Sequence, residues 1–293
     1  MTKSRPLAKT RACIGRSPVW VILGVGLGAV SLPASAACQT TPTTQPATTP
    51  KSVSPEVEAV LDRLERADRE LKDLQAEVEY SVLQLIKAND DDPDDVENFS
   101  GIIKFLKTPE PSRFFLHFDS MNDGSYVSTD RQQWIVFDGV WLTRASETGQ
   151  SVEREQIVRP GEKSDLFKLG QGIFPMPFGQ KKADMLKNFN MRLAPHRDGD
   201  PPGTDHLICE TKKNSELADQ FERIELFVCN DPKSGLVGMP LKIIAVNVRD
   251  STRGTVIFSK IKKNKGLRPD RDFRLPAFTR EWETSEKPLP PQQ

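Results

Sequence analysis

The stretch from Phe99 to Leu142 constrains the fold most, because its apolar residues alternate in short runs that turn signals separate. Side chains of a β-strand point alternately to its two faces. One predicted face carries Phe99, Gly101, Ile103 and Phe105, and the other carries Ile102, Lys104 and Leu106. The pattern predicts several twisted antiparallel strands with apolar residues on both faces. Both faces must then be covered, or one of them must hold a ligand.

The first 37 residues have the features of an export signal. A basic segment is followed by an apolar stretch from Val19 to Leu32 that is short for a membrane span. The sequence Ala34-Ser35-Ala36 is a small-residue cleavage site. We therefore expect export to the periplasm and a mature chain that begins near Cys38.

Two interpretations of Cys38 remain open. It is either a plain thiol near the new N-terminus or the lipidated first residue of a bacterial lipoprotein, which would attach the chain to a membrane. The Thr- and Pro-rich residues 38–53 suit a flexible tether in both cases.

The mature chain is expected to form one domain, residues 54–278, followed by a disordered tail at 279–293. No composition shift or second linker divides the chain after Lys51. The formal net charge is zero, so the chain lacks the basic footprint of a nucleic-acid-binding protein. We expect a monomer with no nucleic-acid partner.

A helix of about twenty residues is predicted to begin at Ser54-Pro55, where serine caps the first turn and proline suits its start. Apolar residues recur at helical spacing as far as Leu74, and from Ala76 the pattern changes to the alternation of a first strand. The apolar side of this helix should pack on a sheet face.

Cys209 and Cys229 lie in neighbouring predicted strands of an exported chain, which favours a disulfide over two buried thiols. Three histidines are present, without a serine-nucleophile elbow, a phosphate loop or paired metal ligands. The sequence therefore predicts no catalytic residue, no metal site and no cofactor.

Proline and glycine interrupt the apolar segment from Leu166 to Gly179 too often for a long helix. Its candidate lid residues over a cavity are Phe174, Met176 and Phe178. Flexible Met and Phe side chains suit irregular apolar ligands. A loop tucked into the core is the alternative.

The order of motifs resembles the periplasmic lipoprotein carrier family of LolA and LolB. A helix and a long strand are followed by Gly101, the corner Lys107-Thr108-Pro109, the turn and aromatic strand from Val127 to Trp134, and the closing Phe273-Arg274-Leu275-Pro276. The resemblance covers most of residues 54–276. It implies an α+β, mainly antiparallel β fold: a curved, incomplete β-barrel whose concave side is covered by helices.

The resemblance also implies that an apolar cavity takes up the acyl chains of lipids or lipoproteins. Strand parity gives the candidate wall residues Phe105, Phe114, Leu116, Phe118, Trp134 and Val136. The chain departs from the family at Thr108, where carriers place an arginine before the corner proline. The expected function is non-catalytic lipid binding, and the alternative is a structural or interaction module of the cell envelope without a ligand.

Overall fold

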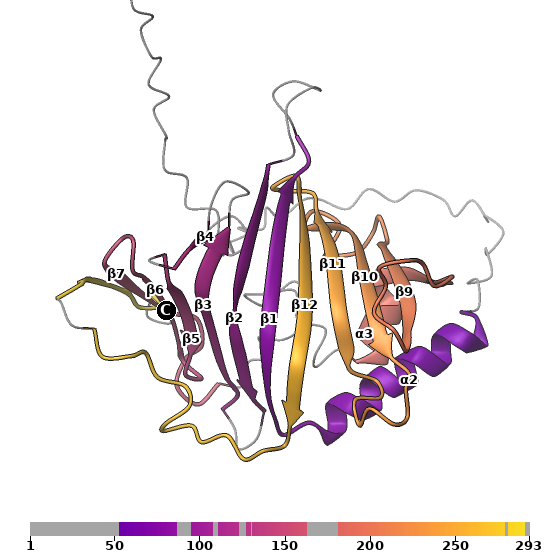
Figure 1. Ribbon diagram of the computed structural model, residues 1–293, viewed down its shortest axis with the longest axis horizontal. Helices are drawn as coiled ribbons and strands as arrows, with labels where there is room; N and C mark the ends of the chain where they lie inside the picture. The colour runs from indigo at the N-terminus through magenta and orange to yellow at the C-terminus, as the bar shows by residue number, and fades with distance from the viewer. Residues whose placement is uncertain are drawn as a thin grey trace, which may run out of the picture.

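The computed structural model describes residues 53–86, 95–107, 111–122, 127–129, 131–162, 181–278 and 281–290. These residues form one large, strongly twisted antiparallel sheet with helices against one side of it (Figure 1). The predicted α+β class and the incomplete barrel are confirmed, because the described strands form an open path that ends at β13 on one side and β8 on the other.

The sheet has thirteen strands in the order β13-β7-β6-β5-β3-β2-β1-β12-β11-β10-β9-β8, with β4 paired to β3. The first seven strands are β1 (Asp73–Gln84), β2 (Val96–Leu106), β3 (Arg113–Asn122), β4 (Val127–Ser128), β5 (Gln133–Phe137), β6 (Trp141–Ser146) and β7 (Ser151–Gln156). The others are β8 (Phe189–Ala194), β9 (Thr204–Thr211), β10 (Phe221–Cys229), β11 (Pro240–Asn247), β12 (Thr252–Lys263) and β13 (Glu283–Lys287). Neighbouring strands are mostly consecutive in the chain, and the long-range pair β1–β12 joins the two halves.

Helix α2 (Pro55–Glu70) begins as its sequence predicts. The Ser54 hydroxyl accepts a hydrogen bond from Val57 N at 3.4 Å. The buried side of α2 consists of Val57, Val60, Leu61, Leu64 and Ala67. The helix ends earlier than predicted, at an extended Leu71, because the chain is already paired as β1 from Asp73 onward.

A corner at the end of β12 fixes the change from helix to strand. Asn264 adopts a left-handed backbone with φ of 54°. Its side-chain oxygen accepts from Lys72 N at 2.8 Å, and its NH₂ group donates to Glu70 O at 3.0 Å. The buried Asp73 carboxylate accepts from the backbone of Lys265 and Gly266. The last carbonyl groups of α2 and the start of β1 thus obtain partners where a regular helix would leave them unsatisfied.

The concave face holds the main core. It combines the buried side of α2 and part of the short helix α3 (Lys182–Asn188) with one face of strands β1–β3, β5, β6 and β8–β12. Helices α2 and α3 contact β8, and α2 also contacts β9. The strand parity read from the sequence for Phe99, Ile103 and Phe105 is confirmed, because all three are buried in this core.

The opposite, convex face is covered by the C-terminal segment of the chain. Phe273 is buried there against Phe115 and Trp134, and Trp282 packs against the same cluster. The rings of Phe278 and Trp282 stack at 3.7 Å between centroids. Figure 1 shows this segment, in yellow, running from the end of β12 to the far edge of the sheet.

The prediction that residues 279–293 form a disordered tail is therefore wrong for the described part of that segment. Strand β13 extends the sheet in parallel with β7. Arg154 forms an ion pair with Glu286, and Arg159 donates to Pro290 O. Every β13 side chain is exposed, so the sequence has no apolar alternation that would mark a strand there. Backbone pairing with β7 and the preceding aromatic residues Phe278 and Trp282 hold the strand in place.

Candidate functional site

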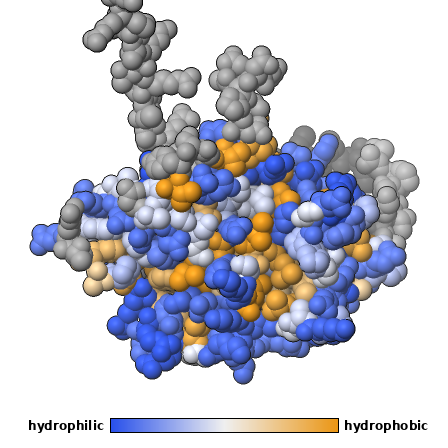
Figure 2. All heavy atoms as spheres, in the orientation of Figure 1, coloured by the Kyte–Doolittle hydropathy of each residue, from blue (hydrophilic) through white to orange (hydrophobic). Residues whose placement is uncertain are grey.

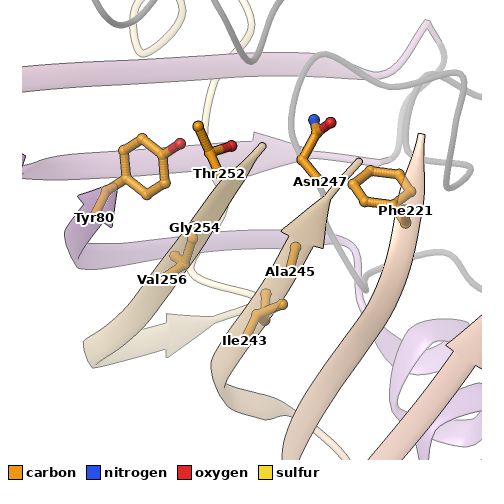
Figure 3. A pocket seen from close by; sticks show the side chains of 8 residues that line it. All are labelled: Tyr80, Phe221, Ile243, Ala245, Asn247, Thr252, Gly254 and Val256. Atoms are coloured by element: carbon orange, nitrogen blue, oxygen red, sulfur yellow. The ribbon is translucent and has the colours of Figure 1, made fainter. Parts of the chain in front are cut away.

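The candidate site is a pocket on the concave face, between β1 and β10 (Figure 3). Its lining residues are Tyr80, Phe221, Ile243, Ala245, Asn247, Thr252, Gly254 and Val256. The lining residues of β11 and β12 lie opposite one another in three cross-strand pairs. These are Asn247 with Thr252, Ala245 with Gly254, and Ile243 with Val256.

The middle pair explains why the pocket is hollow. Ala245 and Gly254 lie directly opposite each other, and together they supply a single Cβ atom. The pair below them, Ile243 and Val256, is buried and forms an apolar floor. The resulting hollow has a volume of about 340 Å³, including space open to solvent.

The third pair makes one end of the pocket polar. Asn247 and Thr252 stand at the ends of their strands, and Phe221 of β10 is paired with Asn247. Figure 3 shows the amide and the hydroxyl at the same end of the lining. The Asn247 side-chain oxygen accepts from Asp250 N at 3.2 Å. The amide orientation is thus set by the turn between β11 and β12.

Tyr80 forms the wall on the β1 side. Its ring lies 6.0 Å from Phe99 and 6.0 Å from Phe118, roughly parallel to both. Burial raises the pKa of Tyr80 far above its ordinary value, and the nearby charges of Glu97 and Asp250 add to the effect. The phenol is therefore neutral at physiological pH, and the wall presents an aromatic face without charge.

Exposed apolar side chains lie beside the polar end of the pocket. Leu85, Ile86 and Val248 are among the large exposed hydrophobic residues. The backbone of Leu85 donates to Ser251 O at 2.8 Å, which brings the end of β1 next to the turn before Thr252. Figure 2 shows apolar side chains through the middle of the face in view, with polar side chains on both sides of them.

Four of the predicted wall residues lie on the concave face but not in the pocket. Phe105, Phe114, Leu116 and Phe118 are buried in the main core. Phe118 and Phe99, for example, approach to 5.3 Å between ring centroids. These side chains fill the space between β2, β3 and β5, so that part of the concave face is packed with side chains from the protein itself.

Trp134 and Val136 were assigned to the wrong face. In the β3–β5 register, Trp134 lies opposite His117 and Val136 opposite Phe115, whereas Leu116 pairs with Ile135. Trp134 and Val136 consequently belong to the convex cluster under the C-terminal segment. The residues of β5 on the concave face are Ile135 and Phe137. Such a one-residue error exchanges the faces of a strand, and the turn before β5 made its parity hard to read.

The predicted disulfide between Cys209 and Cys229 is contradicted, because both are free and buried. Cys209 pairs with Ile224 and Cys229 lies five residues beyond it, opposite Thr204. At about 3.3 Å per residue the two are much farther apart than a disulfide spans. Burial, with a smaller effect of Glu225, raises the pKa of Cys209, so this thiol is unreactive in the folded protein.

The remaining sequence-based candidates lie outside the described residues. These are the lid residues Phe174, Met176 and Phe178, and the proposed lipidation site Cys38. Within the described ranges, no group of three or more His, Cys, Asp or Glu side chains is placed to hold a metal ion. No described helix has the length and apolar character needed to cross a membrane.

The pocket-lining residues of β10, β11 and β12 were not predicted from the sequence. Strands were predicted at 221–229, 241–248 and 255–261, but Thr252 and Gly254 were assigned to the turn before the last of them, whereas β12 begins at Thr252. The hollow also depends on which residues face each other. The alternation of Thr252, Gly254 and Val256 on one face was a usable signal, because glycine inside a strand often marks a place where something approaches the backbone.

No family model matches the chain, and no curated protein matches it. The structure is similar to that of an uncharacterized conserved protein from Thermus thermophilus, with 12% identity, coverage of 79% of this chain and 99% of that one, and a TM-score of 0.43.

Two further solved structures are similar. One is MucB in the Pseudomonas aeruginosa MucA/MucB complex, with 14% identity, a TM-score of 0.38, and coverage of 74% of this chain but only 60% of that one. The other is a LolA superfamily protein from Nitrosomonas europaea, with 13% identity, coverage of 74% and 97%, and a TM-score of 0.30. A protein of the LolA superfamily is thus among the structural neighbours.

Proposed function

We propose that this protein is a non-catalytic binding protein of the cell envelope that holds an acyl chain in the pocket between β1 and β10. The observation that carries the proposal is the hollow over Ala245 and Gly254, which has an apolar floor and a polar end. Each methylene group buried there would contribute about 0.8 kcal/mol. The lining of the pocket is mainly apolar. The pocket would therefore contribute binding affinity for an apolar ligand.

The expected partners are the acyl chains of lipids or lipoproteins. The N-terminal export signal would deliver a monomeric protein to the periplasm, and lipidation of Cys38 would attach it to a membrane through the tether. Intact mass of the mature protein separates the lipidated form from the plain thiol. A lipid-anchored protein would act as a fixed acceptor, and an unanchored one would be free to move between membranes.

A second candidate function is an interaction module of the envelope without a lipid ligand. It is favoured by the dense packing of Phe105, Phe114 and Phe118 in the place where the sequence suggested a cavity wall. The C-terminal segment likewise covers the convex face. In this case the small hollow would be a packing defect.

A pocket-filling substitution distinguishes the two functions. In Ala245→Phe, the new ring would occupy the hollow, and we expect affinity for 1-palmitoylglycerol to fall at least tenfold, which is about 1.4 kcal/mol. Ile244→Phe is the matched control, because Ile244 is the next residue of β11 and points to the other face. Titration calorimetry below the micelle concentration provides the measurement. Equal affinities in both variants and the parent would contradict acyl-chain binding in this pocket.

A further inference from the structure

The pocket lining carries no charged side chain. Its polar groups are an amide, a hydroxyl and a phenol, and burial keeps the phenol neutral. A carboxylate or phosphate that entered the pocket would lose its hydration without gaining a counter-ion, and such a transfer is very unfavourable. The lining therefore discriminates against an anionic end group.

The charges around the polar end increase this discrimination. Glu97 lies on β2 opposite Val82, on the same face as Tyr80, and Asp250 lies in the turn after Asn247. Both are close enough to raise the pKa of Tyr80. Arg249 lies beside Asp250 and partly offsets its charge. Arg253 alternates with Thr252 along β12, so its side chain points to the other face.

Two neutral side chains with hydrogen-bond donors lie at the polar end of the pocket. The Asn247 oxygen is already used by Asp250 N, which leaves the NH₂ group as the donor toward a ligand. Thr252 is fully buried apart from about 1% of its surface, and it lies directly opposite Asn247. Among the described residues, neither the NH₂ group nor the Thr252 hydroxyl has a hydrogen-bond partner. Neither atom is both buried and unsatisfied, so a ligand that accepts hydrogen bonds would replace water as their partner.

We propose that the pocket selects acyl chains whose polar end is a neutral ester or amide carbonyl, with Asn247 and Thr252 as the residues that determine this specificity. This inference rests on the proposed function and specifies its ligand class. The chain would lie over Ala245 and Gly254 toward Ile243 and Val256. The carbonyl oxygen would accept from the Asn247 NH₂ group, the Thr252 hydroxyl, or both. Acylglycerols and acylated peptide ends share this chemistry, whereas free fatty acids do not.

The test compares two probes with the same chain. The full mature protein is titrated with 1-palmitoylglycerol and with palmitate at pH 8, each below its micelle concentration. We expect palmitoylglycerol to bind at least tenfold more tightly. In Asn247→Asp, the retained oxygen still accepts from Asp250 N while the donor is replaced by a charged acceptor, so affinity for palmitoylglycerol should fall at least tenfold.

Thr252→Val and Thr252→Ser form the second arm. Valine keeps the shape but removes the hydroxyl, and we expect affinity for palmitoylglycerol to fall about three- to tenfold, the value of one hydrogen bond. Serine should restore most of the affinity, and palmitate binding should respond to neither change. Unfolding curves verify that each variant is folded.

The outcomes separate the two proposals. Equal binding of palmitoylglycerol and palmitate, with no effect of the Asn247 and Thr252 variants, would overturn the selectivity and leave acyl-chain binding intact. Tighter binding of palmitate would also overturn the selectivity. Absence of binding for both probes would overturn the proposed function and the selectivity together. If a 1-palmitoylglycerol preference survives Asn247→Asp and Thr252→Val, these residues are not its cause.

Discussion

Ala245 and Gly254 lie directly opposite each other on β11 and β12, and together they place one Cβ atom between the polar end and the apolar floor of the pocket. A hollow in a sheet face arises wherever a pair of facing positions lacks side-chain volume, since interiors are otherwise close-packed. The function proposed for this protein depends on that pairing.

Gly254→Ala should raise stability while lowering ligand affinity. A Cβ at this position would meet Tyr80 at 3.4 Å from its nearest atom, which is ordinary contact. Replacing a strand glycine with alanine restricts the unfolded chain and is expected to add about 0.4–1 kcal/mol to the free energy of unfolding. Urea unfolding measures the gain, and titration with 1-palmitoylglycerol measures the loss. A loss of stability would show that the backbone at Gly254 is under constraint.

Gly101→Ala should be strongly destabilising. A Cβ on Gly101 would lie 1.9 Å from the carbonyl oxygen of His117, where the register of β2 and β3 shifts at Ser100 and Gly101. The strands must separate locally to accept it, and we expect a cost of about 2–3 kcal/mol, typical of an overpacked site. Gly254→Ala is the control, because it makes the same chemical change in an uncrowded strand. Urea unfolding that gave similar values for both would refute the close approach of β2 and β3.

Trp282→Ala should loosen the C-terminal segment from the convex face. Trp282 stacks on Phe278 and lies 6.1 Å from Trp134 between ring centroids. Its loss removes apolar contact worth about 2 kcal/mol, so the melting temperature should fall. Glu283→Ala, at an exposed β13 position, should change stability by less than about 0.5 kcal/mol. Melting curves that were the same for both variants would instead indicate a segment without structural importance.

Asp272 should make stability depend on pH at the acidic end. Its carboxylate pairs with Arg271, accepts from Arg268 N at 2.8 Å and lies 3.8 Å from Lys104. These partners, Arg271 first, lower the pKa of Asp272 below its ordinary value. Because the folded-state pKa is the lower one, the contribution is fully present above the unfolded value of about 3.9. It is lost as pH falls through the folded-state pKa.

Asp272→Asn isolates this contribution. We expect the variant to be less stable than the parent in urea at pH 7, and the difference to shrink as the pH is lowered below about 4. Protonation of the parent carboxyl at low pH makes the two proteins alike in charge at this position. A difference in the free energy of unfolding that stayed constant from pH 7 to about pH 3 would exclude the ionic interactions of Asp272 as its source.

Local patterns in the chain were sufficient for the start of α2 and for the buried face of β2. Ser54-Pro55 marked the start of α2, and the alternation through Phe99, Ile103 and Phe105 identified the buried face of β2. These features are readable because capping and strand parity depend on residues a few positions apart. The same logic failed at Trp134, where a turn of uncertain length precedes the strand and its parity is set by pairing with β3.

The site itself was decided by the tertiary structure. Residues far apart in the chain, such as Tyr80 and Val256, become neighbours only when β1 pairs with β12. The pairing of β11 with β12 places Ala245 beside Gly254 and brings Asn247 and Thr252 to the same end of the pocket. The pairing of β9 with β10 separates Cys209 from Cys229. The sequence by itself determined which residues could form strands and which faces would be apolar. The cross-strand register determined where side chains fill the concave face and where they leave room, because packing depends on residues that meet in space.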